Sequence, residues 1–177
     1  EAGQGKNPSR YIAALDLAVE KSGYGKKALP AGRAYGLAVH ESFNSVVAYV
    51  VEASVKEGTP LLHKVTAGVH CNFCVNPRAV EAQVQGAVTM AIGLTLPGAA
   101  ITFKDGVVEQ SQFSDYQIAR MSEVSDVAVH IVPSMEPPTG MGEPGLPPLA
   151  PAFANAIAKV TGKRLRSLPF DLQQLKT

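Results

Sequence analysis

A single carboxylate, Glu143, lies in the middle of a loop rich in glycine and proline, within the stretch 139–145. Glycine allows a backbone to approach a ligand closely, and proline restricts the conformations that a loop can adopt. A carboxylate held rigidly beside an apolar cleft can act as a general base near neutral pH. The alternative is an ordinary solvated glutamate, so the residue types alone make Glu143 a candidate base without deciding between the two.

Two thiols form a second candidate centre at Cys71 and Cys74, with His70 adjacent and His63 nearby in the sequence. Such a pair suggests either a zinc site or a thiol redox pair. A structural zinc site normally needs four ligands at regular spacing, and a second pair is missing from the sequence. The pattern therefore favours two ordinary, partly buried thiols.

Two amides, Gln83 and Gln85, lie near the start of an otherwise apolar segment that is expected to be helical. A buried amide needs hydrogen-bond partners. Those partners are either a polar ligand or neighbouring backbone groups. The sequence by itself favours the structural role and leaves the ligand-binding role open.

The composition places these groups in one globular domain. The chain has 177 residues, of which 46% are hydrophobic and 18% charged, and its formal net charge is +1. This length supports a substantial core, and the near-zero net charge gives no reason to expect nucleic acid as a partner. The longest mainly apolar stretch, 84–100, is shorter than the roughly 20 residues that a membrane helix needs, so no membrane span is expected.

The elements that position the candidate groups follow from hydrophobic periodicity. Helices are expected at about 8–22, 78–96 and 151–160. Strands are expected at 34–40, 47–55, 62–70 and 127–132, with a short hairpin at 101–108 and a long loop from 133 to 151. The second and third strands alternate cleanly about a turn, which predicts a long antiparallel hairpin.

These elements predict an α+β fold in which a mixed or antiparallel sheet packs against helices. The hairpin 45–70 and the strand near Val127 form one sheet, and the helix at about 78–96 covers one face of it. That helix carries no charge after Glu81, so it is expected to be buried.

Five stretches, taken together and in order, resemble a known family: 36–43, 75–86, 111–116, 142–152 and 161–170. They are similar to the molybdopterin-binding large subunits of the xanthine dehydrogenase and aldehyde oxidase family, in particular to the isoquinoline-oxidising type. Several spaced motifs in the same order are more specific than any one of them alone. The resemblance implies a molybdenum-cofactor-binding-domain-like fold, with residues 1–177 as the C-terminal portion of a longer subunit.

The resemblance also implies a chemistry. Molybdenum is held by molybdopterin, in the cytosine dinucleotide form, and a small iron–sulfur subunit with 2Fe–2S clusters removes the electrons. The implied substrate is an N-heterocyclic aromatic or an aldehyde, and the incorporated oxygen comes from water. The remainder of the large subunit and the iron–sulfur subunit are the implied protein partners.

Three site residues carry over from the family's motifs. Glu143 matches the catalytic general base, Gln83 matches a glutamine that contacts the pterin, and Gly142 would let the loop lie close to the cofactor. None of the three is expected to be a metal ligand. An amide such as that of Gln83 can both donate to and accept from pterin ring atoms.

The sequence departs from the family at the end of the central hairpin. The chain has His70, Cys71 and Asn72 where the family commonly has Asp-Cys-Gly, so the hairpin end is expected to pack differently. An alternative function therefore stays open, namely a non-catalytic packing or subunit-contact module. As a piece of a larger body, the chain is also expected to expose an apolar patch and to self-associate.

Overall fold

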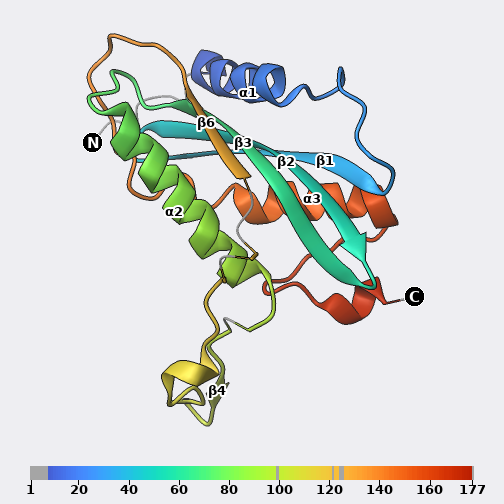
Figure 1. Cartoon of the computed structure of the whole chain (residues 1–177). Coiled ribbons are helices and arrows are strands. Elements are labelled where there is room, and N and C mark those ends of the chain that lie inside the picture. The colour runs from blue at the N-terminus through green and yellow to red at the C-terminus, as the bar shows by residue number, and fades with distance from the viewer. Residues whose placement is uncertain (1–7, 99, 121, 124–125, 177) are drawn as a thin grey trace.

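The computed structural model describes residues 8–98, 100–120, 122–123 and 126–176. Its centre is a four-stranded sheet with the strand order β1-β2-β3-β6 and helices on both faces (Figure 1). The strands are β1 (Arg33–Ser42), β2 (Ser45–Lys56), β3 (Thr59–His70) and β6 (Asp126–Ile131). The first three are antiparallel and β6 is parallel to β3, which confirms the predicted α+β fold with a mixed sheet.

The predicted hairpin is the longest pairing in the sheet. β2 and β3 pair from Val46 opposite His70 to Lys56 opposite Thr59, with one register shift after Glu52. The β1–β2 turn places Phe43 and Asn44 at φ values of 51° and 57°. Positive φ at both central residues is typical of the tight hairpin turns whose twist matches that of the strands.

Strand β2 is buried on both faces, since every residue from Val46 to Val51 is at most 1% exposed. Val47, Tyr49 and Val51 belong to the larger core, while Val46, Ala48 and Val50 belong to a smaller one on the other face. The sequence pattern predicted a helix on one face only. The unbroken apolar run of β2 is the pattern of a strand covered on both sides.

Helix α1 (Pro8–Ser22) covers the face with the smaller core, over β2 and β3. Its fully buried residues are Ala14 and Ala18. A Cβ atom on Gly68 of β3 would overlap the carbonyl oxygen of Ala14 and lie 2.9 Å from the Ala18 nitrogen. The helix backbone therefore rests directly on the strand, and only glycine fits at position 68.

Helix α3 (Leu149–Thr161) makes the equivalent contact on the opposite face, over β1 and β2. A Cβ atom on Gly36 of β1 would overlap backbone atoms of Ala152 and Ala156. The helix ends at Gly162, whose φ of 74° is the left-handed conformation common at helix C-termini.

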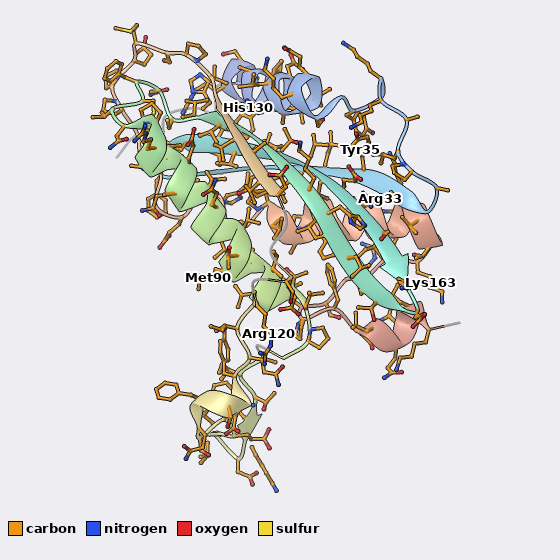
Figure 2. The ribbon with its side chains drawn as sticks, in the orientation of Figure 1. Arg33, Tyr35, Met90, Arg120, His130 and Lys163 are labelled. Atoms are coloured by element: carbon orange, nitrogen blue, oxygen red, sulfur yellow. The ribbon has the colours of Figure 1, made fainter. Side chains whose placement is uncertain are left out.

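Helix α2 (Pro77–Thr95) lies on the same side as α3 and contributes Val84, Val88 and Ile92 to the larger core. Its N-terminus is capped by Asn76, whose side chain accepts a hydrogen bond from the Ala79 nitrogen. The expectation that this helix is buried was wrong for its outer side. Met90 there is 59% exposed, and Figure 2 shows it on the side away from the sheet. Only the side of α2 that faces the core is buried, and the opposite side faces solvent.

A small arm extends beyond the end of α2 in Figure 1 and contains the predicted short hairpin. It consists of β4 (Phe103–Lys104), β5 (Val107–Val108) and the 3-10 turn η1 (Phe113–Asp115). Most of its large apolar side chains are exposed: Ile101, Phe103, Val107, Val108, Phe113 and Ile118.

The chain after α3 packs back onto the larger core. The Phe170 ring packs against that of Phe153 in a tilted arrangement with ring centroids 5.7 Å apart, and the Phe170 nitrogen donates to the Thr95 carbonyl oxygen. The last element is the 3-10 turn η2 (Leu172–Leu175). No helix in the described parts of the chain is both long enough and apolar enough to cross a membrane.

Candidate active site

The loop 132–148 joins β6 to α3 and carries Glu143. It contains no helix or strand. It begins as a continuation of the sheet, because the Val132 nitrogen donates to the Val69 carbonyl oxygen at 2.8 Å. Beyond that point its two halves are held by different parts of the fold.

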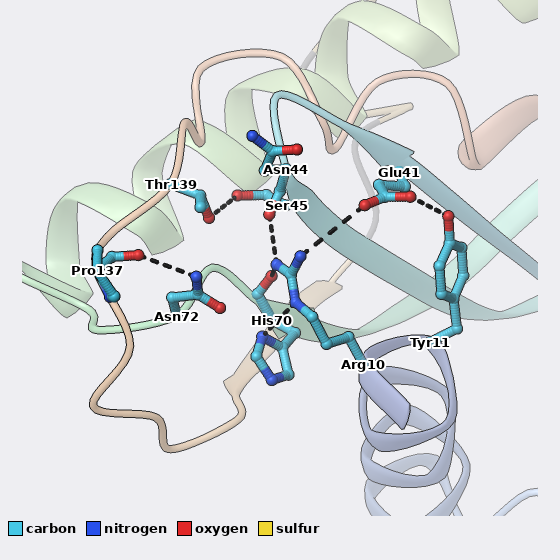
Figure 3. Close-up of polar contacts among 9 residues, drawn as sticks. All are labelled: Arg10, Tyr11, Glu41, Asn44, Ser45, His70, Asn72, Pro137 and Thr139. Carbon is cyan, nitrogen blue, oxygen red and sulfur yellow. Dashed lines mark hydrogen bonds and ion pairs between the residues drawn. The ribbon is translucent and has the colours of Figure 1, made fainter. Parts of the chain in front are cut away.

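The first half is held by the bend that follows β3. The Phe73 nitrogen donates to the Glu136 carbonyl oxygen at 2.9 Å, and the Thr139 nitrogen donates to the Cys71 carbonyl oxygen at 3.2 Å. The side-chain amide of Asn72 donates to the Pro137 carbonyl oxygen at 2.9 Å (Figure 3). Asn72 has a φ of 59°, a left-handed conformation that asparagine tolerates better than most residues.

The β1–β2 turn holds the same half from the other side. The Gly140 nitrogen donates to the Phe43 carbonyl oxygen at 3.2 Å, and the hydroxyls of Ser45 and Thr139 are hydrogen-bonded at 2.7 Å. Ser45 is fully buried. A Cβ atom on Gly140 would lie 3.0 Å from the Phe43 Cβ, so the turn and the loop are packed closely here.

Arg10 of α1 ties this turn to the end of β3, as Figure 3 shows. Its guanidinium donates to the carbonyl oxygens of Asn44 and His70 and to the His70 ring nitrogen Nδ1, the last at 3.4 Å. The Glu41 carboxylate forms an ion pair with the Arg10 guanidinium at 3.9 Å and also accepts a hydrogen bond from the Tyr11 hydroxyl. Burial, with the Arg10 charge, lowers the pKa of His70.

The second half of the loop is held by the core itself. The hydroxyl of Tyr49, a fully buried residue, donates to the Gly145 carbonyl oxygen at 2.7 Å. A Cβ atom on Gly145 would lie 2.8 Å from that hydroxyl, 3.1 Å from the Ala87 Cβ and 3.5 Å from the Val84 Cα. Burial raises the pKa of Tyr49, so the hydroxyl keeps the proton that it donates. The loop is thus fixed between β2 and α2.

Of the residues predicted from the sequence, Glu143 and Gly142 lie where these two halves meet, and Gln83 lies on α2. Glu143 and Gly142 are exposed, and the nearby Gly145 contacts α2 at Val84, next to the exposed Gln83. Within the described residues, the side chains of Glu143 and Gln83 have no hydrogen-bond or ionic partner. The fold therefore brings the loop of Glu143 against the helix of Gln83. The described residues do not enclose Glu143 in an apolar cleft.

Gly142 differs from the other glycines of this loop. A Cβ atom there would meet no described atom within 4 Å, and its φ is not in the left-handed region. Neither backbone conformation nor packing within the described residues requires glycine at this position.

The two thiols, Cys71 and Cys74, are free. Cys71 is buried, and burial together with the neighbouring Cys74 raises the pKa of its thiol to about 11. A raised pKa disfavours the thiolate that metal binding and redox chemistry need. His63 lies elsewhere, hydrogen-bonded to the Ser54 hydroxyl at 2.8 Å. Among the described residues, no group of three or more His, Cys, Asp and Glu side chains is arranged to hold a metal ion. These findings favour the interpretation as ordinary thiols.

Sequence reasoning missed the residues that hold the loop, namely Arg10, Ser45, Tyr49 and Asn72. One signal was present, because Asn72 replaces a glycine of the family pattern and asparagine is among the few residues suited to a left-handed bend. The others act through contacts between segments far apart in the sequence, which no local pattern reveals.

Comparisons with known proteins agree with this architecture. Residues 11–125 match the family model of a molybdopterin cofactor-binding domain, a range that includes Gln83 but not Glu143. The beta subunit of isoquinoline 1-oxidoreductase from Brevundimonas diminuta is 33% identical over 173 residues, which cover 94% of this chain and 22% of that protein. The chain thus spans about a fifth of that relative's length.

Two further comparisons extend the match. A nicotinate dehydrogenase subunit from Pseudomonas putida is 30% identical over 152 residues, covering 82% of this chain and 13% of that protein. The crystal structure of an aldehyde oxidoreductase from Desulfovibrio desulfuricans superposes with a TM-score of 0.61 at 21% identity, covering 74% of this chain and 15% of that chain. At this low identity the structural match supports the fold.

Proposed function

The chain belongs to the molybdopterin cofactor-binding domain family, and on that premise we propose that it is the C-terminal portion of the large subunit of a molybdenum hydroxylase. The proposed reaction is hydroxylation of an N-heterocyclic aromatic, or oxidation of an aldehyde, with water as the oxygen source. The names of the relatives that act on isoquinoline and nicotinate support the first substrate class, and the name of the aldehyde oxidoreductase supports the second.

The residues on the outer side of α2 and on the loop suit a large polar cofactor. Gln83 offers an unpaired amide, Glu143 offers an unpaired carboxylate, and Gly142 leaves open space beside the backbone. When bound, the molybdenum cofactor supplies the two-electron redox chemistry. In the proposed arrangement, Gln83 donates to and accepts from the pterin ring, and Gly142 allows the backbone to approach the cofactor.

Glu143 is the proposed general base. A carboxylate oxygen of Glu143 accepts the proton of the water-derived nucleophile, and the carboxyl group holds that proton while the substrate is oxidised. The observation that carries this proposal is the fixation of the loop on both sides of Glu143, by the β1–β2 turn and by Tyr49. A base needs such fixed placement, because misplacement by about 1 Å can cost roughly 100-fold in rate.

The proposal includes the finer features that the family resemblance implies. The pterin carries cytosine dinucleotide, and a small iron–sulfur subunit with 2Fe–2S clusters takes up the electrons. The remainder of the large subunit closes over the exposed surface at Glu143 and excludes water during the reaction.

The test is Glu143→Gln in the intact, cofactor-loaded enzyme. Glutamine keeps the size and polarity of the side chain but cannot take up the proton, so turnover per bound molybdenum should fall by about 10²–10⁴-fold. Molybdenum content should stay near that of the unaltered enzyme, because the proposed role is proton transfer.

The matched control is Glu136→Gln, an exposed glutamate of the same loop whose side chain has no described partner. Its turnover should remain within about twofold of the unaltered enzyme. Full activity per molybdenum in the Glu143→Gln enzyme would contradict the proposed mechanism at its centre.

A non-catalytic contact module is the second candidate function, and the exposed apolar arm favours it. Phe113 is fully exposed and Phe103 is 66% exposed, which is unusual for large apolar side chains unless another surface covers them. If contact were the whole function, Phe103→Ser with Phe113→Ser would abolish subunit assembly, while Glu143→Gln would leave activity unchanged. Sedimentation of the chain at high concentration tests the related expectation that it self-associates.

A further inference from the structure

A concave surface lies at the end of α3 opposite the Glu143 loop. Two adjoining cavities of about 510 and 480 Å³ share Tyr24, Tyr35 and Lys159 in their walls. They form where the end of α1, the start of β1 and the last turn of α3 meet. α3 has 13 residues, so about 20 Å of helix separates this surface from the loop at its other end. We call the two together the Tyr24–Tyr35 cavity.

The charged residues that line the Tyr24–Tyr35 cavity are all cations. Lys26, Lys27, Lys159 and Arg164 line it, and no carboxylate is among its lining residues. Burial, together with the Glu52 carboxylate, raises the pKa of Tyr35, and that carboxylate is paired with Arg33 at 2.6 Å. Within the described residues none of these four cations forms an ion pair, although Lys21, Arg33 and other basic residues elsewhere do. The protein as a whole has a net charge of only +1, so this clustering is local.

The cavity also has an aromatic wall. The rings of Tyr24 and Tyr35 lie 5.5 Å apart between centroids at an angle of 57°. The Lys159 ammonium lies 5.2 Å from the centre of the Tyr24 ring and donates to the Tyr24 hydroxyl at 3.2 Å. The Tyr35 hydroxyl donates to the Ser22 carbonyl oxygen, which fixes that ring. Lys159 thus contacts the aromatic wall, while the other three cations are exposed to solvent.

We propose that the Tyr24–Tyr35 cavity binds a nucleotide. Lysine and arginine side chains are the usual partners of phosphate groups, and tyrosine rings provide surfaces on which a flat base can stack. Each of the two volumes, about 510 and 480 Å³, lies within the usual range for small-molecule sites. Inorganic phosphate would leave the aromatic wall unused, and an uncharged aromatic molecule would leave four cations unmatched. The proposal is independent of the reaction proposed at Glu143.

The test is isothermal titration calorimetry of the intact protein that carries this chain, with ATP, AMP, adenosine and inorganic phosphate as probes. ATP should bind saturably, and adenosine and inorganic phosphate should each bind at least about 10-fold more weakly, because each lacks half of the recognised groups. Binding of ATP should weaken as salt is raised, since exposed charges are screened.

Two variants and a control locate the site. Lys159→Gln with Arg164→Gln should weaken ATP binding by about 10-fold or more, as should Tyr24→Leu. Lys104→Gln removes the same charge from the distant arm, where the residue is exposed, and should leave ATP binding within about twofold. Circular dichroism of each variant establishes that it is folded.

Several outcomes would overturn the proposal. These are the absence of saturable ATP binding, inorganic phosphate binding as tightly as ATP, or equal weakening by Lys104→Gln. Tight binding of polyglutamate without binding of ATP would also overturn it, because that result would assign the surface to an acidic protein partner.

Discussion

Glycines serve opposite purposes in the helix–sheet sandwich and on the surface formed by α2 and the Glu143 loop. At Gly36 and Gly68 a helix backbone rests on a strand, and a Cβ atom would overlap a carbonyl oxygen. At Gly86 and Gly142 a Cβ atom would meet no described atom within 4 Å, and neither residue has a left-handed φ. Packing within the sandwich therefore explains why Gly36 and Gly68 are glycine. Packing among the described residues does not explain Gly86 and Gly142, which is consistent with a group outside these residues that approaches the surface of α2 and the loop.

The largest predicted effect on stability comes from disrupting the contact between α1 and β3 in the sandwich. Gly68→Ala forces the α1 backbone away from β3 and should lower the unfolding free energy by about 3 kcal/mol or more, the upper end of the range for overpacking a core. Urea unfolding, followed by circular dichroism, measures it.

Gly86→Ala is the matched control, in an exposed helical position with open space around it. It should raise the unfolding free energy by up to about 1 kcal/mol, the difference in helix propensity between glycine and alanine. Equal destabilisation by both substitutions would mean that the two classes of glycine are not distinct.

The next largest effect concerns the hydrogen bond that joins β2 of the sandwich to the Glu143 loop. Tyr49→Phe removes the hydroxyl that donates to the buried Gly145 carbonyl oxygen, and the unmatched oxygen should cost about 1–3 kcal/mol of unfolding free energy. Because this bond also fixes the loop beside Glu143, turnover of the intact enzyme should fall as well, with molybdenum content unchanged. A stability loss without any loss of turnover would show that the loop does not depend on Tyr49 for its placement.

A smaller effect follows from His70, whose pKa burial and the Arg10 charge lower below the ordinary value of 6.5. The unfolded chain then binds more protons than the folded chain at mildly acidic pH, so stability is full above about pH 6.5 and declines as the pH falls below it. His63 and His130 have lowered pKa values and act in the same direction. Urea midpoints at pH 7.5 and pH 5.5 measure the decline, which His70→Gln should reduce.

The smallest predicted effect on stability is the most informative for function. Gly142→Ala should change the unfolding free energy by no more than about 0.5 kcal/mol, because its Cβ enters open space. In the intact enzyme the same substitution should reduce molybdenum and pterin content, since the methyl group occupies the space proposed for the cofactor. Unchanged cofactor content would remove Gly142 from the proposed site. Gln83→Ala should act in the same way, by loss of its amide contact.

Local patterns in the sequence predicted most of the fold. Helix α1 has the predicted bounds, the strands differ by a few residues, and the hairpin 45–70 pairs as expected. The second covered face was missed, although the apolar run of β2 signals it. Gly36 and Gly68 could not be identified as packing positions, because their need for glycine comes from helices distant in sequence.

The candidate site was predictable only in part. Glu143, Gln83 and Gly142 were identified through family motifs, and their roles stay predictions. The structure adds that the loop of Glu143 contacts the helix of Gln83 at Gly145. The Tyr49 hydroxyl fixes that contact, and backbone hydrogen bonds of residues 43, 71 and 73 hold the other half of the loop at 136–140. Backbone bonds do not depend on residue type, so the sequence could not reveal them.

The double attachment of the Glu143 loop has a thermodynamic consequence. Ordering a loop costs roughly 1–2 kcal/mol per residue in backbone entropy. Here, the loop donates hydrogen bonds to the carbonyl oxygens of Phe43 and Cys71 and accepts one from the Tyr49 hydroxyl, so contacts within the folded chain itself order the loop. A cofactor that binds to this surface therefore meets a preorganised loop, so little of its binding free energy is lost to ordering that loop.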